Sequence, residues 1–302
     1  MSLYKLITPK AFSELLHKET TCRVIPVDAT WFLPNLKRDG RQEFKDIERI
    51  PGSVFFDIDY IKDPNSKYTH MAPDSNTFNK SMRELGIKKD DILVVYDRNG
   101  NFSAPRVAWT IALFGHSPIY LLNNFQLYKN EGYPIDTTKK SAFSEYPKSD
   151  YTSEVDLRSK EIVSYEELVE LVKSGKLASE YNAFDARSLG RFEGRDPEPR
   201  ADMPSGHISG SDPLPYPEVL NEGVFPSTEE ANKDKLNEAF KKLDIEFHAE
   251  KPTIVMCGSG VTSIIIKTAL EQSGAKDVRC FDGSWIEWVS RSDPSMLAVN
   301  RD

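Results

Sequence analysis

A cysteine followed by a glycine-rich loop is the part of this sequence best suited to chemistry. Cys257 follows an apolar run at residues 253–256, and a helical pattern covers residues 263–272. A strand, a cysteine, a loop and a helix in this order point free main-chain N–H groups and the positive end of the helix dipole at the sulfur. Such surroundings lower a thiol pKa and make the thiolate available as a nucleophile. The alternative is a buried cysteine that serves only as a small apolar side chain.

The loop after the cysteine is suited to holding an anion. Its two glycines allow the backbone to curl so that successive N–H groups face inward, and its hydroxyl side chains add further donors. Thr262 could also serve as the N-cap of the next helix, and the two roles are compatible. We therefore expect a cradle for a thiolate or a persulfide, formed by Gly258, Ser259, Gly260, Val261 and Thr262.

A cluster of arginines forms a second candidate site. Four arginines fall within fourteen residues of an otherwise acidic chain, in a stretch with Gly and Pro and no helical period, so we expect a loop. Guanidinium groups bind carboxylates through paired hydrogen bonds, which favours a site for a substrate anion. The alternative is a solvated loop in which the arginines pair with neighbouring acids. The arginines are Arg187, Arg191, Arg195 and Arg200, and the acids are Glu193, Asp196 and Glu198.

The elements that position these residues occur twice. Short segments match at an offset of about 160 residues, and each copy alternates β-rich runs with helical stretches. This alternation predicts an α/β fold in which each domain has a mainly parallel sheet with helices on both faces. We expect a first domain at residues 1–136, a polar linker at 137–159 and a second domain at 160–302.

The two copies differ at the cysteine. Where the second copy has Cys257, the first has Asp97. A carboxylate cannot replace a thiolate as a sulfur nucleophile. We therefore expect the second domain to be catalytic and the first to be inactive.

Composition restricts the partners. The 302 residues carry a net charge of −8, which argues against direct binding of nucleic acid or an anionic membrane. No apolar run approaches the roughly 20 residues of a membrane span.

Three cysteines and five scattered histidines suggest neither a disulfide framework nor a metal site, so we expect no metal and no cofactor. The expected compartment is reducing: the cytoplasm, with the mitochondrion as an alternative.

Several segments together resemble the tandem-rhodanese sulfurtransferase family, over roughly residues 5–290. The loop at 257–262 is the most specific match and resembles that of 3-mercaptopyruvate sulfurtransferases. Among subgroups, the chain is most similar to the fungal one that also serves tRNA thiouridine modification, and the ending at 300–302, Asn-Arg-Asp, points the same way. The other matching segments are residues 55–59, 70–71, 104–106, 190–192, 197–200, 206–208 and 283–285.

The resemblance implies a reaction and the residues that perform it. Sulfur from 3-mercaptopyruvate or thiosulfate would pass through a persulfide on Cys257 to a thiophilic acceptor, while Arg191 and Arg200 hold the substrate carboxylate. Asp59 and His70, from the inactive domain, would form a proton relay to Ser259 in a cleft between the domains. On the sequence alone, His70 is more simply interpreted as a surface histidine. Thiosulfate-preferring relatives carry basic residues where this chain has Gly258 and Ser259.

Three other functions compete with this interpretation. A cysteine phosphatase needs an arginine six residues after the cysteine, where this chain has Ser263. A protein-to-protein relay would take persulfide from a cysteine desulfurase and pass it, through a ubiquitin-like-activating or sulfur-carrier protein, into tRNA wobble-uridine 2-thiolation. A non-enzymatic interaction module would fit the copy with Asp97 but fits the copy with Cys257 poorly.

Overall fold

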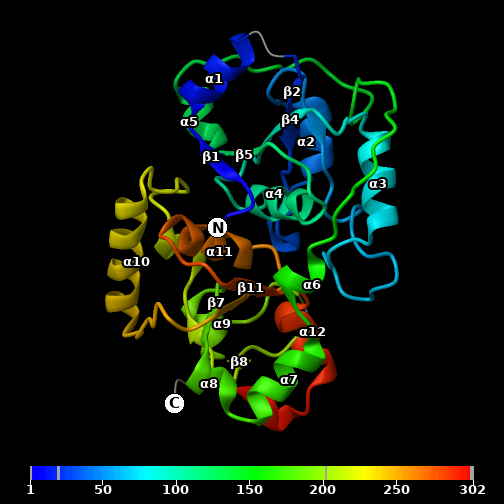
Figure 1. Cartoon of the computed structure of the whole chain (residues 1–302). Helices are drawn as coiled ribbons and strands as arrows, with labels where there is room; N and C mark the ends of the chain where they lie inside the picture. Colours follow the sequence, from blue (N-terminus) through cyan, green and yellow to red (C-terminus); the bar gives the residue numbers. More distant parts are fainter. Residues whose placement is uncertain (1, 19–20, 201–202, 300–302) are drawn as a thin grey trace. The chain divides into compact units, whose positions relative to one another are not determined.

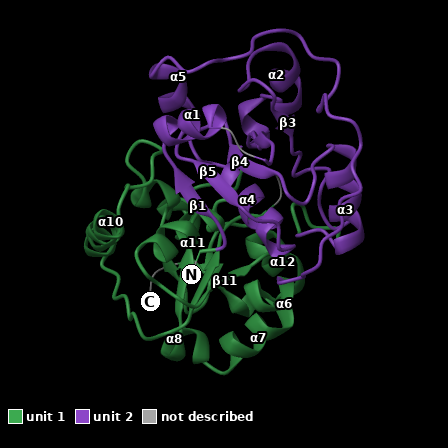
Figure 2. Cartoon of the chain, turned by 45° about the horizontal axis from the view of Figure 1, so that its top comes forward, with its two compact units in different colours: residues 1–2, 66–71, 158–302 green, residues 3–65, 72–157 purple. Residues whose placement is uncertain are grey.

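The computed structural model describes residues 2–18, 21–200 and 203–299, and the chain divides into two compact units (Figures 1 and 2). Unit 2 contains residues 3–65 and 72–157, whereas unit 1 contains residue 2, residues 66–71 and the described residues from 158 onward. Residues 66–71 therefore group with the second half of the chain, although their neighbours in sequence belong to the first half. The ending at 300–302 lies outside the described residues.

Unit 2 is built on a five-stranded parallel sheet in the order β1-β5-β4-β2-β3. The segment 137–157, which the sequence predicts as most of a linker, belongs to this unit, and its Phe143 packs against Phe44 and Phe55. The elements are β1 (Lys5–Ile7), α1 (Pro9–His17), β2 (Val24–Asp28), η1 (Pro34–Leu36), α2 (Gly40–Asp46), β3 (Val54–Phe55), α3 (Ser75–Glu84), β4 (Ile92–Tyr96), α4 (Ala104–Leu113), β5 (Ile119–Leu122) and α5 (Phe125–Asn130).

Unit 1 repeats this plan with a parallel sheet in the order β6-β11-β10-β7-β9 and adds a small antiparallel pair, β8 and β12. The elements are α6 (Arg158–Glu161), β6 (Ile162–Val163), α7 (Tyr165–Lys173), α8 (Lys176–Glu180), β7 (Asn182–Asp185), α9 (Leu189–Phe192), β8 (His207–Ile208), β9 (Asp212–Pro213), η2 (Tyr216–Val219), α10 (Glu229–Leu243), β10 (Thr253–Met256), α11 (Ser263–Gln272), β11 (Val278–Phe281), α12 (Ser284–Arg291), η3 (Pro294–Met296) and β12 (Leu297–Ala298).

The two sheets have the same strand order, so the internal repeat and the α/β class predicted from the sequence are confirmed. The central strands β4 and β10 correspond, and each is followed by a loop and then by a largely buried helix, α4 or α11. These strands lie between parallel neighbours on both sides, which explains their continuous apolar runs in place of an alternating pattern.

Two features are absent from the part of the chain that the structure describes. None of its helices has the length and apolar character that crossing a bilayer requires. No three of its His, Cys, Asp and Glu side chains lie close enough together to hold a metal ion.

Candidate active site

Cys257 is held at the edge of the unit 1 sheet where parallel strands end. It directly follows β10, whose last residue, Met256, pairs with Asp185 at the end of β7. The side chain is only 2% exposed. Because the carboxyl ends of parallel strands open at one edge, this edge is where α/β proteins commonly place their ligands.

The loop donates hydrogen bonds to the Cys257 sulfur. Burial alone would raise the pKa of this thiol, but bonds from the Thr262 hydroxyl, from the amides of Ser263 and Ser259 and from the Ser263 hydroxyl outweigh burial and lower it. Thr262 makes no side-chain capping bond to α11, so its hydroxyl serves the sulfur. Gly260 has a φ of +77°, which a residue with a Cβ adopts only with strain.

The start of α12 fixes the same loop from the other side. The amide of Trp285 donates to the carbonyl of Cys257 at 2.9 Å, and the amide of Ile286 donates to the carbonyl of Gly258 at 3.0 Å. The amide of Cys257 in turn donates to Oγ of Ser284 at 3.1 Å. Groups that would otherwise be unpaired at a loop and a helix end therefore satisfy each other, which makes the loop rigid.

His70 contacts the cradle within unit 1. Its Nδ1 lies 3.1 Å from Oγ of Ser259. The histidine is 3% exposed and has a positive φ of 65°, so it is a buried residue in an unusual backbone conformation and not a surface histidine. Its hydrogen bond places one imidazole nitrogen where a proton can pass to or from the Ser259 hydroxyl.

Asp59 belongs to unit 2. There its Oδ2 accepts a hydrogen bond from Nε1 of Trp31 at 2.9 Å, and the Trp31 ring stacks on Phe102. The inclusion of Asp59 in a proton relay stays a prediction.

The arginines of the 187–200 loop divide by their surroundings. Arg187 is fully buried and acts as a structural residue: it binds Asp185, Glu198 and the carbonyl of Gly206, and its guanidinium lies 4.5 Å from the centre of the Trp285 ring. Arg195 pairs with Glu193 at the surface, as the alternative interpretation of this loop expects.

Arg191 is the arginine that reaches the cysteine loop. Its Nη2 binds Glu198, which is shared with Arg187, and a Cβ added to Gly258 would come within 3.0 Å of that same Nη2. Nε of Arg191 is buried and makes no hydrogen bond to any described residue. Gly258 therefore leaves room for a guanidinium group beside Cys257, and one N–H of that group is unsatisfied.

Arg200 lies in the same unit as residues 66–71. Its Nη2 donates to Oγ1 of Thr69 at 3.3 Å, next to His70 in the sequence. The structure thus brings together Cys257, the loop, His70 and Arg191 by direct contacts, and it links Arg200 to the neighbour of His70.

In the first copy, the equivalent loop holds a carboxylate in place of the thiol. The carboxylate of Asp97 accepts hydrogen bonds from the amides of Asn99 at 2.8 Å, Ser103 at 2.9 Å and Ala104 at 2.7 Å. Two of these amides occupy the repeat positions of Ser259 and Ser263, which serve the sulfur in unit 1. Burial nevertheless raises the pKa of Asp97 above its ordinary value. The loop is therefore an anion cradle in both copies, and in unit 2 the chain fills it with its own carboxylate.

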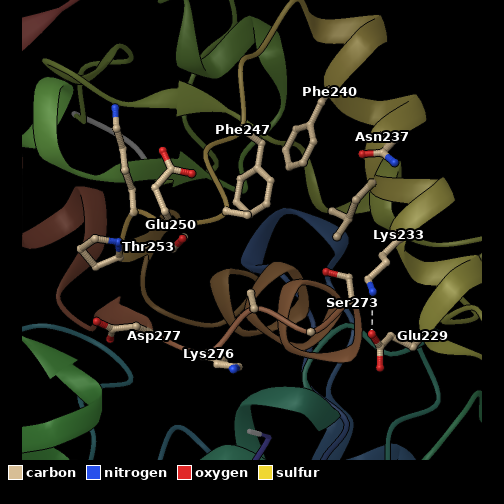
Figure 3. Close-up of a pocket in the computed structure, with 16 residues that line it drawn as sticks. Glu229, Lys233, Asn237, Phe240, Phe247, Glu250, Thr253, Ser273, Lys276 and Asp277 are labelled. Atoms are coloured by element: carbon tan, nitrogen blue, oxygen red, sulfur yellow. Dashed lines mark hydrogen bonds and ion pairs between the residues drawn. The ribbon is translucent and has the colours of Figure 1, made fainter.

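A cavity in unit 1 lies elsewhere. It measures about 700 Å³ and is lined by residues of α10, of the loop that leads into β10, of the start of β10 and of the segment that follows α11. Figure 3 shows Phe240, Phe247 and Thr253 around it, with an ion pair between Lys233 and Glu229 at its rim. Thr253 begins β10 whereas Cys257 follows its end, so this cavity is at the wrong edge of the sheet for the thiol chemistry.

Comparison with known proteins gives the family. The model of the rhodanese-like domain matches residues 28–126 and 164–291, one stretch in each half of the chain. The chain belongs to the rhodanese family. It is a sulfurtransferase with two rhodanese-like domains, which confirms the fold and the class of reaction expected from the sequence.

Three relatives of this sulfurtransferase are similar over most of their length. Thiosulfate sulfurtransferase TUM1 of Saccharomyces cerevisiae is 54% identical over 100% of both chains, and its crystal structure matches with a TM-score of 0.97. The 3-mercaptopyruvate sulfurtransferase of Mus musculus is 37% identical, over 90% of this chain and 86% of its own. A sub-stoichiometric sulfur transferase subunit of yeast mitochondrial complex I is 34% identical, over 98% and 100%, with a TM-score of 0.81.

Sequence reasoning missed parts of the rhodanese site. The sequence places Ser284 at the start of a helix, in a segment that resembles the family, but does not indicate that it accepts a hydrogen bond from the Cys257 amide. It presents Glu198 only as an acid that could pair with the arginines, whereas the carboxylate binds both Arg191 and Arg187. It presents Ser263 only as the residue that stands where a phosphatase needs an arginine, whereas the Ser263 hydroxyl lies 3.7 Å from Sγ of Cys257.

Proposed function

We propose that this sulfurtransferase moves sulfane sulfur from 3-mercaptopyruvate through a persulfide on Cys257 to a thiophilic acceptor. One observation supports this most strongly: a buried thiol in an anion cradle has the guanidinium of Arg191 against its loop, and Nε of that guanidinium makes no hydrogen bond to the described residues. A thiolate nucleophile and a carboxylate receptor are the two groups that such a donor requires.

The first half-reaction loads the cysteine. The Cys257 thiolate attacks the sulfur of 3-mercaptopyruvate, an S–S bond forms and the C–S bond breaks. The bonding pair stays on carbon, so the enolate of pyruvate leaves, and the proton of the donor thiol passes from the outer sulfur through Ser259 and His70 to the enolate carbon. The cradle of Gly258, Gly260, Val261 and Thr262 then holds the negative outer sulfur of the persulfide.

The second half-reaction removes the outer sulfur from the Cys257 persulfide. A nucleophilic acceptor attacks the outer sulfur, the S–S bond breaks and the thiolate of Cys257 returns. Because the donor product leaves before the acceptor reacts, the kinetics are ping-pong. In this proposal Arg191 and Arg200 hold the donor carboxylate, and Asp59 orients His70.

Thiosulfate is the competing donor, since a relative is named for it. We favour mercaptopyruvate because thiosulfate has no carboxylate, and the residues after Cys257 supply no cation. Steady-state kinetics with both donors, together with intact-mass detection of one added sulfur, decide between them. We expect a higher kcat/KM for mercaptopyruvate, and the adduct should disappear in Cys257→Ser. Turnover by Cys257→Ser at the wild-type rate would overturn the proposal.

The relay into tRNA thiolation is the second candidate. Its support is the similarity to the fungal subgroup and the net charge of −8, which suits a protein partner better than RNA. A cysteine desulfurase would then load Cys257, and a ubiquitin-like-activating or sulfur-carrier protein would unload it. The location is proposed as cytoplasmic, with the mitochondrion as the alternative because one relative is described in a mitochondrial complex. Normal wobble-uridine thiolation in a deletion strain would exclude the relay.

A further inference from the structure

Besides the hydroxyls of Thr262 and Ser284, a buried hydroxyl at the start of the helix that follows the loop contacts the nucleophile. Ser263 is the first residue of α11 and is completely buried. Its Oγ lies 3.7 Å from Sγ of Cys257 and 3.4 Å from Sγ of Cys280. Cys280 is also completely buried, on β11, where it pairs in register with Val255.

The chemistry of the three groups fixes the direction of their hydrogen bonds. A thiolate only accepts, so the single hydroxyl hydrogen of Ser263 points to Cys257 when that residue is ionised. The oxygen of Ser263 is then available as an acceptor, and the thiol of Cys280 is a weak donor at hydrogen-bond distance from it. The result is a chain from Cys280 through Ser263 to the nucleophile.

The first copy shows that a serine hydroxyl at this position does not by itself bond to the group held in the cradle. Ser103 stands at the repeat position of Ser263, but its Oγ donates to the carbonyl of Ala29 at 2.7 Å and accepts from the amide of Trp31 at 3.1 Å. At the repeat position of Cys280 the first copy has Leu121, since both residues pair with the equivalent residue of the central strand. The chain of donors is therefore specific to the unit that holds the thiol.

We propose that Ser263, oriented by the thiol of Cys280, is a positioning residue for sulfur transfer that donates a hydrogen bond to Cys257 and holds it as a thiolate. The inference rests on the nucleophilic role of Cys257 proposed above. It concerns the resting thiolate, so it can be tested without any donor or acceptor.

The test is the pH dependence of iodoacetamide alkylation, followed on the peptide that contains Cys257. In Ser263→Ala the midpoint should move to higher pH, and the rate near neutral pH should fall by about tenfold, as expected for the loss of one hydrogen bond to a charged group. The pH profile of kcat/KM should move in the same direction. An unchanged midpoint in a folded Ser263→Ala protein would overturn the proposal.

Two further comparisons separate this role from a merely structural one. Ser103→Ala removes the equivalent hydroxyl from the first copy and should leave the midpoint unchanged. Cys280→Ala should shift it upward by less than Ser263→Ala does, whereas Cys280→Ser, which keeps a donor, should restore it. If Ser263→Ala fails to fold, the Cys280 pair carries the test, and equal midpoints for the two Cys280 variants would overturn the proposal. If alkylation shifts as expected but the wild-type protein transfers no sulfur, the proposed function fails and this inference stands.

Discussion

Arg191 owes its position to the carboxylate of Glu198. Glu198 is buried and binds Nη2 of Arg191 and Nη1 of Arg187, so neither arginine can turn without breaking a buried ion pair. The fixed orientation leaves Nε of Arg191 buried and without a hydrogen bond to the rest of the described chain. A buried unsatisfied donor costs about 1–3 kcal/mol, and a substrate carboxylate that accepts from it would recover part of that free energy.

We therefore expect Arg191→Ala to weaken binding of mercaptopyruvate. The loss of a charged hydrogen bond, about 1.5–3 kcal/mol, corresponds to a KM about 10- to 100-fold higher. Steady-state kinetics measure it. Arg195→Ala is the matched control, because Arg195 lies in the same loop and pairs with Glu193 at the surface. An equal rise of KM in both variants would contradict the prediction, because the loss of any arginine from this loop would then weaken substrate binding.

At the scale of elements, the segment 137–157 is anchored to unit 2 by a buried histidine. Tyr151 packs edge-on against Phe78 and stacks on His116 at 5.7 Å between ring centres. Nε2 of His116 donates to the carbonyl of Asp91 at 2.9 Å, and its Nδ1 accepts from the Tyr151 hydroxyl at 3.2 Å. These partners suit the neutral imidazole, since the charged form has no acceptor to offer the tyrosine.

Stability should consequently depend on pH through His116. Burial lowers its pKa from 6.5 to about 4, so between these values the unfolded chain binds the proton and the folded chain does not. The contribution is fully present above pH 6.5 and should be lost as the pH falls towards 4, by an amount on the order of 2–3 kcal/mol. Chemical denaturation across this window, compared with His116→Gln, measures it. Identical pH slopes for the two proteins would contradict the prediction.

The strand β12 supports the arginine loop of unit 1. It pairs with β8, and a Cβ on Gly206, just before β8, would come within 2.5 Å of the carbonyl oxygen of Ala298. The amide of Gly206 donates to the carbonyl of Arg191 at 3.0 Å. Gly206 therefore contacts β12 on one side and the backbone of Arg191 on the other.

Removal of residues 297–302 should therefore raise KM for mercaptopyruvate more than it lowers kcat. We expect KM to rise about tenfold, because a displacement of a binding group by about 1 Å can lower the efficiency of an enzyme by up to about 100-fold. Gly206→Ala should have an effect in the same direction, because the added methyl group meets Ala298. Kinetics measured well below the unfolding temperature test this, and a fall in kcat with KM unchanged would argue against it.

At the scale of the whole chain, both units contain an anion cradle, but only the cradle of unit 1 holds a thiol. The two cradles also differ at the residue that follows the thiol or the carboxylate. Arg98 follows Asp97 at the position of Gly258, and its guanidinium binds Asp28 at 3.2 Å and Glu43 at 3.1 Å. In unit 1 the ion pair to Asp185, at the repeat position of Asp28, comes from Arg187, which also binds Glu198. The second copy thus supplies its buried cation from another strand end and keeps the loop position clear for Arg191.

A cysteine placed in the first cradle should consequently remain without sulfurtransferase activity. We expect the variant Asp97→Cys, Cys257→Ser to fold but not to turn over mercaptopyruvate, because Arg98 occupies the place of Gly258. Asp97→Cys alone, with Cys257 intact, should keep wild-type activity and serves as the control. A persulfide on the introduced cysteine, together with normal turnover, would show that the cradle alone suffices.

The sequence predicts the repeat, the parallel sheets and the cysteine loop because local patterns encode them. Apolar runs mark β4 and β10, and Gly258 and Gly260 mark the loop. The surroundings of His70 and Arg191 could not be predicted, since they depend on contacts between residues far apart in the chain. His70 lies 189 positions before Ser259, and nothing near it in the sequence indicates that it is buried. Ser263 and Ser103 are the same residue type at one repeat position, and only the structure shows that they serve different partners.

The carboxylate of Asp97 bears on how a duplicated domain can lose its reaction and keep its fold. A loop that gathers three inward N–H groups needs a negative charge at its centre, since each buried donor left unpaired destabilises the domain by about 1–3 kcal/mol. The Asp97 carboxylate accepts all three hydrogen bonds without a substrate. An aspartate in place of the cysteine therefore removes the thiol and retains an acceptor for the donors of the loop. The fold of the first copy therefore does not depend on a thiol at this position.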